Sequence, residues 1–171
     1  MSTRSPEIKI HTHPLSLLQD PGRITSVQRG EIIHRALSFL EHCSGIEDIE
    51  RAILRAFALQ GVDRARWDME RDYLNPLWAA LCLHEVRPWF ERGVRNLREV
   101  EVVDAQGELH RIDRLIIGDG AVEVIDFKVG QREEGHQLQV ELYQRLVEAV
   151  FHQTTKGYLL YIDEPAVVAV S

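Results

Sequence analysis

The sequence has few of the features that mark secreted or membrane-spanning proteins. Only two of its 171 residues are cysteines, Cys43 and Cys82, and their separation fits no spacing typical of zinc or iron–sulfur ligation. We interpret both as reduced, buried thiols. No apolar run is long enough to span a bilayer, and the N-terminus lacks the basic start and apolar core of a signal peptide. We therefore expect no membrane association and a cytoplasmic location.

Basic residues are also in short supply. The chain carries 20 Lys and Arg against 27 Asp and Glu, which gives a net charge of −7. A protein that holds nucleic acid tightly by itself needs clustered Lys and Arg to neutralise the phosphates. The composition argues against that class, but it allows an enzyme that binds a divalent metal and acts on DNA delivered by another component. The length suits one ordinary domain with a real core.

The first part of the chain is predicted to be helical after an irregular start. Residues 1–25 contain three prolines and no sustained period, so we expect a leader or a linker there. A single domain is predicted over residues 26–171. Its first helix is expected to run from Ser26, a plausible N-cap, to about His42.

Three further helical regions follow from apolar spacing. One is expected to end before Gly61, and another covers residues 64–84 with an interruption near Asn75-Pro76, because proline cannot continue the hydrogen-bonding ladder. A last helix is expected over residues 135–151. Its predicted core stripe consists of Leu138, Leu142, Leu146 and Val150, with Tyr143 and Val147 beside it.

Between these helices the pattern becomes β. Strands are predicted over residues 94–103, 108–118 and 121–128, and two shorter closing strands over residues 158–162 and 166–170. The first three are joined by short turns and form an antiparallel meander. The fold class is therefore α+β, or an α/β/α sandwich if helices cover both faces of the sheet.

The two turns fix which residues face each other across the meander. Asp119-Gly120 is a two-residue hairpin signal, and it places Asp113 opposite Asp126. The preceding turn suits a three-residue loop with a left-handed residue, and it places Glu99 opposite Asp113. Three carboxylates then form one row across three strands, where neighbours about 5 Å apart should repel each other. Such a row indicates a bound cation or a site of chemistry.

The residues around this row favour phosphodiester hydrolysis. Asp113 and Asp126 supply the oxygen ligands that Mg²⁺ prefers, and the backbone carbonyl of Phe127 borders the same space. Lys128 points to the same face as Asp126 and can orient an attacking water or stabilise charge on a phosphate. An isolated Asp-x-Lys is more often a solvated edge. Here it alternates with apolar residues, which favours a buried site. Glu123 faces the other way and is interpreted as solvent-exposed.

Five sequence elements in order resemble the motif series of the PD-(D/E)xK nuclease superfamily, and more narrowly the RecB/AddA-type nuclease domain of helicase–nucleases. These elements are Gly30-x-x-x-His34, Glu99, Ile112-Asp113-Arg114, Asp126-Phe127-Lys128 and Gln139-x-x-x-Tyr143. The resemblance covers roughly residues 29–163. It implies a restriction-endonuclease-like core, with a mixed central sheet flanked by helices, and cleavage of DNA that depends on Mg²⁺ or Mn²⁺.

The resemblance also implies roles for individual residues. The metal ligands would be His34, Asp113, Asp126 and the Phe127 carbonyl. The catalytic set would be Lys128, Asp126, Asp113 and Glu99. Gln139, Tyr143 and Gly30 would border the substrate. His136 departs from the family, which tends to have an aromatic residue before the Gln. The cysteines that hold an iron–sulfur cluster in some relatives are absent, so no cluster is implied.

Several residues keep a second interpretation. A histidine on an apolar helix face, such as His34, is more often a core residue than a ligand, although Gly30 one turn earlier opens space beside it. Gln139 and Tyr143 fit the edge of a core as well as a functional role. A group of arginines with two aromatic residues suits either a DNA backbone or a solvated face. Its members are Arg87, Arg92, Arg95, Arg98, Trp89 and Phe90.

The sequence therefore supports one main hypothesis and one alternative. The main hypothesis is a Mg²⁺- or Mn²⁺-dependent deoxyribonuclease that acts on single strands or DNA ends, with a helicase domain or subunit as partner. The alternative is a catalytically silent scaffold that binds DNA or a helicase. The acidic net charge slightly favours the scaffold. The complete set of acids and the lysine favours the enzyme.

Overall fold

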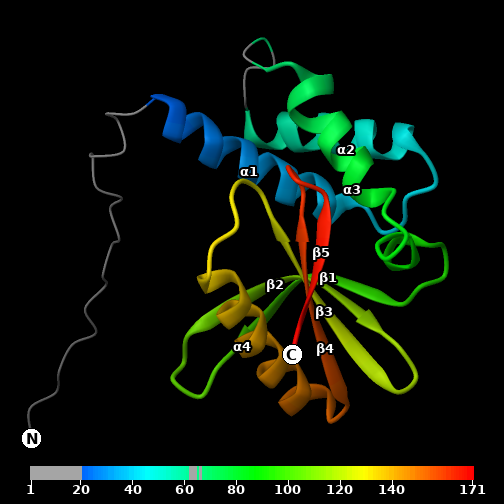
Figure 1. Ribbon diagram of the computed structural model, residues 1–171, viewed down its shortest axis with the longest axis vertical. Helices are drawn as coiled ribbons and strands as arrows, with labels where there is room; N and C mark the ends of the chain where they lie inside the picture. The colour runs from blue at the N-terminus through cyan, green and yellow to red at the C-terminus, as the bar shows by residue number, and fades with distance from the viewer. Residues whose placement is uncertain (1–20, 62–64, 66) are drawn as a thin grey trace, which may run out of the picture.

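A five-stranded sheet lies between helices in the computed structural model, which describes residues 21–61, 65 and 67–171 (Figure 1). The helical elements are α1 (Pro21–Phe39), α2 (Ile46–Gln60), the π-helical η3 (Glu70–Leu74), α3 (Asn75–Leu81), the 3₁₀-helical η4 (Arg87–Phe90) and α4 (Gly135–Phe151). The strands are β1 (Asn96–Val103), β2 (Leu109–Ile117), β3 (Ala121–Lys128), β4 (Thr154–Tyr161) and β5 (Ala166–Val170). The predicted α+β class with helices on both faces is confirmed.

The sheet is mixed, and its strands follow chain order. Strands β1, β2 and β3 form the predicted antiparallel meander, and β4 pairs with β5 in the same antiparallel manner. Strand β3 instead pairs with β4 in parallel, because α4 carries the chain back to the starting edge between them. The catalytic candidates on β3 therefore lie on a central strand.

Both predicted hairpin registers are confirmed by the pairing. Arg114 pairs with Ile125 across β2 and β3, and the N–H of Gly118 donates to the carbonyl of Ala121 at 3.0 Å, as the Asp119-Gly120 turn requires. In the other hairpin Val103 pairs with Leu109. Gly107 there has a φ of 85°, which is the left-handed residue that the three-residue loop needs.

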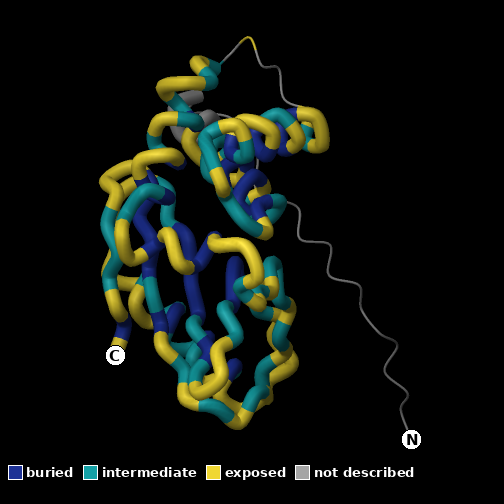
Figure 2. Tube along the Cα trace, turned by 90° about the vertical axis from the view of Figure 1, so that its right-hand side faces the viewer, coloured by how far each residue is buried: buried dark blue, intermediate teal, exposed yellow. Residues whose placement is uncertain are grey.

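Two apolar clusters hold the layers together, one on each face of the sheet. In Figure 2 the buried residues, in dark blue, are found along the strands of the sheet and in the helices packed on it. On one face α1, α2 and α3 cover Ile125, Phe127 and Leu160. On the other face α4 covers Val124 and Leu159. Because side chains alternate along β3, Asp126 lies between two residues that face the α1 side and belongs to the α4 side of the sheet.

Helix α1 begins earlier than the sequence predicts. It starts at Pro21 and ends at Phe39, whereas the expected span ran from Ser26 to about His42. Proline is favoured in the first turn of a helix, where its missing N–H has no helical partner to lose. The predicted leader therefore enters the helix at its last residues, and residues 1–20 lie outside the described part of the chain.

The helical region before the sheet is continuous where a break was predicted. Helix α3 follows η3 directly, and Pro76 falls in its first turn, where a proline is tolerated. The π-helical turn η3, in which each hydrogen bond spans one residue more than in an α-helix, marks the start of this helical region instead. Strand β4 begins at Thr154, four residues before the predicted start. The prediction missed these first residues because they have no apolar pattern.

The predicted core stripe of α4 is wrong. The buried residues of α4 are Val140, Tyr143 and Val147, whereas Leu138 and Val150 are 65% and 60% exposed. The reason lies in β4, where Gly157 lets α4 approach closely. A Cβ atom at Gly157 would lie 2.6 Å from Cγ1 of Val140. The absence of a side chain at Gly157 leaves room for the Val140 side of α4 to pack against the sheet.

Two smaller expectations can also be compared with the structure. Cys43 and Cys82 are free thiols, but both are half-buried instead of fully buried. Within the described ranges, no helix has both the length and the apolar content needed to cross a membrane.

Candidate active site

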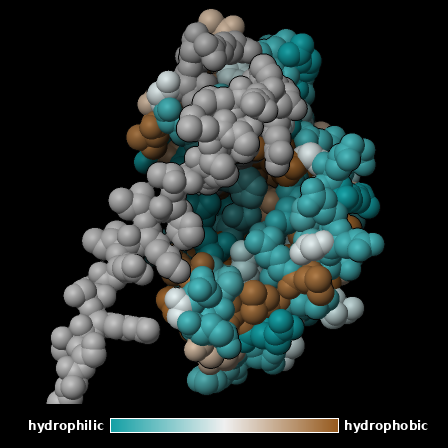
Figure 3. Space-filling view, turned by 90° about the vertical axis from the view of Figure 1, so that its left-hand side faces the viewer, coloured by the Kyte–Doolittle hydropathy of each residue, from teal (hydrophilic) through white to brown (hydrophobic). Residues whose placement is uncertain are grey.

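A groove of about 1400 Å³ opens between α1 on one side and α4 with the start of β2 on the other. Figure 3 shows the molecule hollowed on this face, with apolar atoms below the hollow. Asp113, Asp126 and Lys128 line the groove, and so do His34 and Gly30 from α1. The fold thus brings together segments that are up to about a hundred residues apart in the chain.

Asp113 and Asp126 form the buried acidic centre of the groove. They are 7% and 4% exposed. Oδ2 of Asp113 accepts a hydrogen bond of 2.8 Å from the backbone N–H of Phe127, which joins β2 to β3 beyond the last ladder pair. Burial and, next, the charge of Asp113 raise the pKa of Asp126, and Lys128 offsets part of this rise. The repulsion predicted between the two carboxylates is therefore present in the structure.

Lys128 is held between this acidic centre and α4. Its Nζ lies 2.6 Å from Oδ2 of Asp126 and donates a hydrogen bond of 2.6 Å to Oε1 of Gln139. Nε2 of Gln139 in turn donates to the hydroxyl of Tyr143 at 2.8 Å. Burial raises the pKa of the Tyr143 hydroxyl, and the nearby charge of Asp126 adds to the rise. The motif residues of α4 therefore form one chain of contacts that ends at the lysine.

His34 reaches the same centre from α1. Its Nδ1 lies 3.2 Å from Oδ1 of Asp113, and its ring packs edge-on to Phe127 with centroids 6.4 Å apart. Burial by itself would lower the pKa of His34, but the hydrogen bond and the charge of Asp113 outweigh it, so that the pKa is raised. Gly30 lines the groove one turn earlier. A Cβ atom there would make only ordinary contact, 4.0 Å from Cβ of Val129, so the glycine is not required for the approach.

His136 contacts Tyr161 rather than the acidic centre. Its Nδ1 lies 3.2 Å from the hydroxyl of Tyr161, and the two rings are tilted, with centroids 5.9 Å apart. Burial, followed by the positive charge of Lys128, lowers the pKa of His136. The position at which this sequence departs from the family therefore belongs to the edge of the site.

Glu99 does not join the row of acids. Its carboxylate pairs with Arg111 instead, with Nε and Oε2 3.3 Å apart, and it is not among the residues that line the groove. The register agrees with the predicted alignment to Asp113, since Arg98 pairs with Arg114 and Val100 with Ile112. However, Glu99 has a φ of 52°, and this left-handed conformation takes it out of the pairing between β1 and β2 and redirects its side chain.

Three residues that sequence reasoning missed hold the site in position, and they are Arg29, Gly130 and Asp163. Nη1 and Nη2 of Arg29 donate to the carboxylate of Asp163 at 3.1 and 2.6 Å, and the N–H of Gly130 donates to the same carboxylate at 2.7 Å. This bracket ties α1 to the loop after Lys128.

Glu123 was predicted to be exposed, but it is half-buried and accepts a hydrogen bond of 2.8 Å from Nε1 of Trp89. No local pattern predicts these long-range pairs.

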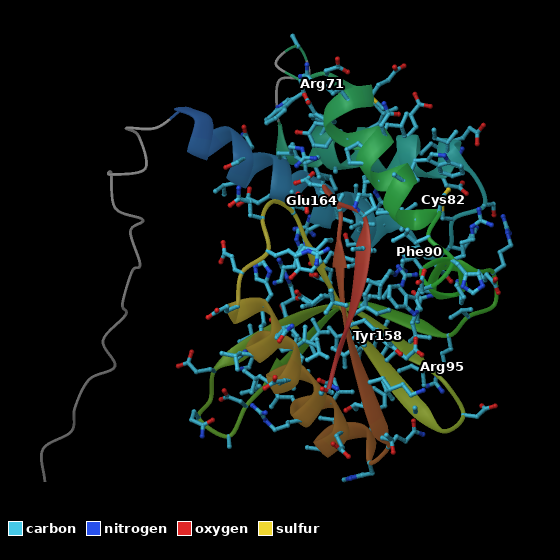
Figure 4. All side chains as sticks on the ribbon, in the orientation of Figure 1. Arg71, Cys82, Phe90, Arg95, Tyr158 and Glu164 are labelled. Carbon is cyan, nitrogen blue, oxygen red and sulfur yellow. The ribbon has the colours of Figure 1, made fainter. Side chains whose placement is uncertain are left out.

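The predicted arginine and aromatic cluster does not form a DNA-binding face at this groove. Trp89 and Phe90 are buried, at 4% and 3% exposed, so neither ring is free to stack on a base. Phe90 and Arg95 lie on the side of the sheet away from α4 (Figure 4). Arg114 is fully buried there and donates to the carbonyls of Leu40 and Glu41 at 2.8 Å each.

The donor atoms at this site fit a hard divalent cation, although the side chains are paired with one another. Within the described ranges, no three His, Cys, Asp or Glu side chains are gathered to hold a metal ion. Oδ2 of Asp126 is buried, and no donor in the described part of the chain makes a hydrogen bond of good geometry to it. Its 2.6 Å contact with Lys128 is an ion pair. This oxygen and Asp113 are the carboxylate donors that Mg²⁺ or Mn²⁺ prefers.

Comparison with known proteins agrees with this geometry. The chain matches the PD-(D/E)XK nuclease superfamily over residues 12–169, which is nearly its whole length, and it belongs to that superfamily. The mixed sheet flanked by helices is the fold of that class. Among solved structures, the crystal structure of SSO0001 is similar at 20% identity, over 88% of this chain and 78% of that one, with a TM-score of 0.37. A search of curated proteins gave no match.

Proposed function

We propose that the protein is a Mg²⁺- or Mn²⁺-dependent deoxyribonuclease that acts on single strands or DNA ends. The observation that carries this proposal is the convergence of Asp113, Asp126 and Lys128 at the floor of one groove, with His34 in hydrogen-bond contact with Asp113. Membership of a superfamily of nucleases supplies the reaction class, phosphodiester hydrolysis.

We assign the metal to the oxygen-rich side of this group. Asp113, Asp126 and the carbonyl of Phe127 would hold the ion, with His34 as a further ligand. When bound, a divalent ion lowers the pKa of a coordinated water and polarises a phosphoryl oxygen. It would also relieve the repulsion that raises the pKa of Asp126, since the ion's positive charge favours the ionised carboxylate.

The protein's own groups have separate tasks in this proposal. Lys128 is the catalytic cation, because its ammonium can orient a water and stabilise the charge that develops on the phosphate. Gln139 holds Lys128, and Tyr143 holds Gln139. Asp113 keeps Phe127 and His34 in place through both of its oxygens. Glu99 could act only after a rearrangement that releases Arg111.

We also propose a helicase domain or subunit as the partner. The motif series resembles that of helicase-linked nucleases, and the chain's net charge of −7 gives it little attraction for DNA on its own. The outer side of α4 is exposed and apolar at Leu138 and Val150, which suits contact with another protein. A DNA repair or recombination setting would follow from such a partner.

The proposal is tested with DNA cleavage and metal binding measured on the same variants. Wild-type protein with Mn²⁺ is expected to shorten labelled single-stranded DNA, whereas Asp126→Ala and Lys128→Ala should lose at least about a hundredfold in rate. Mn²⁺ binding by calorimetry should be lost in Asp113→Ala but retained in Lys128→Ala. Undiminished cleavage by both the Asp126 and Lys128 variants would overturn the assignment.

The alternative function is a catalytically silent scaffold that binds DNA or a helicase. The observation that favours it is the paired state of the site, in which Lys128 and His34 already contact the carboxylates of Asp126 and Asp113. A scaffold would bind its partner without needing a metal. Absence of any Mn²⁺ affinity that depends on Asp113, combined with intact partner binding, would select this alternative.

A further inference from the structure

Two exposed aliphatic side chains line the groove from different elements. Val27 on α1 is 53% exposed, and Leu109 at the start of β2 is 61% exposed. Neither belongs to the two apolar clusters that hold the layers together. Single exposed aliphatic residues are common on protein surfaces. These two differ because both border the one groove that contains Asp113 and Asp126.

The charges of the groove leave little for a phosphate backbone to bind. It is lined by the carboxylates of Glu31, Glu101, Asp113, Asp126, Glu133 and Asp163, and by the cations of Arg29, Arg35, Arg111 and Lys128. Three of these cations are already paired, with Asp163, Glu99 and Asp126. Of the four, Arg35 alone has no ion-pair partner in the described part of the chain. Phosphate contacts therefore supply little of the affinity.

Beside Leu109, the wall of the groove contains the half-buried ring of His110. His110 follows Leu109 and packs edge-on to Tyr143 with ring centroids 6.2 Å apart, and both line the groove. Nε2 of His110 is 2.8 Å from Oδ2 of Asp104, which fixes the ring at the base of the hairpin. Tyr143 is buried, so the surface open to a nucleobase consists of the exposed Leu109 and Val27 side chains with the half-buried His110 ring beside Leu109.

We propose that Leu109 and Val27 contact the unpaired bases of a single DNA strand and select it over duplex DNA. This inference rests on the proposed nuclease function and names its specificity-determining residues. In a duplex the faces of the bases are stacked and their edges are paired, so only a single strand can offer base faces to these side chains. Because the groove is acidic, base contact and the bound metal together must hold the strand.

The test measures binding separately from cleavage. Lys128→Ala keeps both carboxylates and prevents the chemical step, and it serves as the background for fluorescence anisotropy with Mg²⁺. The probes are a labelled thymidine 20-mer, an abasic strand of the same length and a 20-base-pair duplex. Leu109→Ala and Val27→Ala are each expected to weaken binding of the thymidine strand about five- to tenfold, as expected for losing a buried aliphatic contact. Binding of the abasic strand and of the duplex should not change.

The hairpin supplies a matched control. Val103 pairs with Leu109 across the strands and is 60% exposed, but it does not line the groove. Val103→Ala should therefore leave all three affinities as they are, and Leu109→Phe should preserve binding of the thymidine strand. Equal losses on the abasic strand, or no loss on the thymidine strand, would overturn the inference. A failure of wild-type cleavage would instead count against the nuclease proposal.

Discussion

Nζ of Lys128 donates a hydrogen bond of 2.6 Å to Oε1 of Gln139, and this contact joins the central strand β3 to α4. The same ammonium lies 2.6 Å from Oδ2 of Asp126. A flexible lysine is thereby held by one neutral and one charged oxygen. The amide of Gln139 is itself fixed by Tyr143. The position of the proposed catalytic cation thus depends on a helix residue that never needs to touch the reacting atoms.

Replacing Gln139 should therefore impair turnover more than substrate binding. Gln139→Ala removes a hydrogen bond to a charged group, for which a loss of about 1.5 kcal/mol, or about tenfold in kcat, is expected. KM should change little, since the proposed base contacts lie elsewhere. Steady-state cleavage of single-stranded DNA with Mn²⁺ measures both constants. Gln137→Ala, at an exposed position on the same helix, is the control. A change confined to KM would contradict this positioning role.

Asp126→Asn should stabilise the metal-free protein at neutral and alkaline pH. Burial and Asp113 raise the pKa of Asp126 from 3.8 to about 6, so the folded state holds this proton more tightly than the unfolded state does. The contribution of the protonated Asp126 to the stability of the folded state is complete below about pH 4 and is lost as the pH rises through 6. Asparagine removes the cost of burying the charge, although Lys128 then loses its partner. We expect a net gain of about 1 kcal/mol at pH 8.

Urea unfolding in EDTA, at pH 4 and at pH 8, measures this difference. The gain should be present at pH 8 and absent at pH 4. Asp119→Asn, in the exposed turn between β2 and β3, should behave like wild type at both values. A destabilised Asp126→Asn at pH 8 would show that the ion pair with Lys128 outweighs the burial of the charge.

Arg114 should be among the most sensitive positions for stability. It is fully buried, it donates to the carbonyls of Leu40 and Glu41 after α1, and its guanidinium lies 4.0 Å from the centre of the Phe90 ring. Arg114→Leu leaves both carbonyls without their donor, and a loss of about 3 kcal/mol is expected.

Arg114→Lys should recover only part of this loss, because an ammonium lacks the planar fork that serves two acceptors. Arg95→Leu is the exposed control and should change the free energy of unfolding by less than about 0.5 kcal/mol. The comparison requires only urea titrations of the four proteins. Equal stability of the Arg114 and Arg95 variants would show that the hydrogen bonds from Arg114 to Leu40 and Glu41 do not stabilise the fold.

The outcome of the sequence predictions depends on how local their causes are. The pairing that aligns Asp113 with Asp126 follows from a two-residue turn, so adjacent residues were enough to predict it. The bracket between Arg29 and Asp163 joins residues 134 positions apart and leaves no local pattern. The left-handed conformation of Glu99 could not be predicted from the sequence either, because a glutamate seldom adopts it. The buried face of α4 was missed because it depends on the close approach that Gly157 on β4 permits.

Gly157 lies under α4, where a Cβ atom would come within 2.6 Å of Cγ1 of Val140 and of the side-chain carbonyl group of Gln144. Gln144 is polar and flexible and can move aside, but Val140 is buried and cannot. Gly157→Ala should therefore push α4 away from β4 and cost about 1–3 kcal/mol of stability.

Displacement of α4 would also reach the active site, since Gln139 lies one residue from Val140 and holds Lys128. We therefore expect Gly157→Ala to lower kcat as well as the urea midpoint. Gly120→Ala is the control, because no heavy atom of the described residues lies within 4 Å of an added Cβ atom there. The second substitution Val140→Ala makes room for the new methyl group, and it should restore part of the lost kcat in Gly157→Ala. If kcat stays at the wild-type value in Gly157→Ala while stability falls, the packing of α4 does not position Lys128.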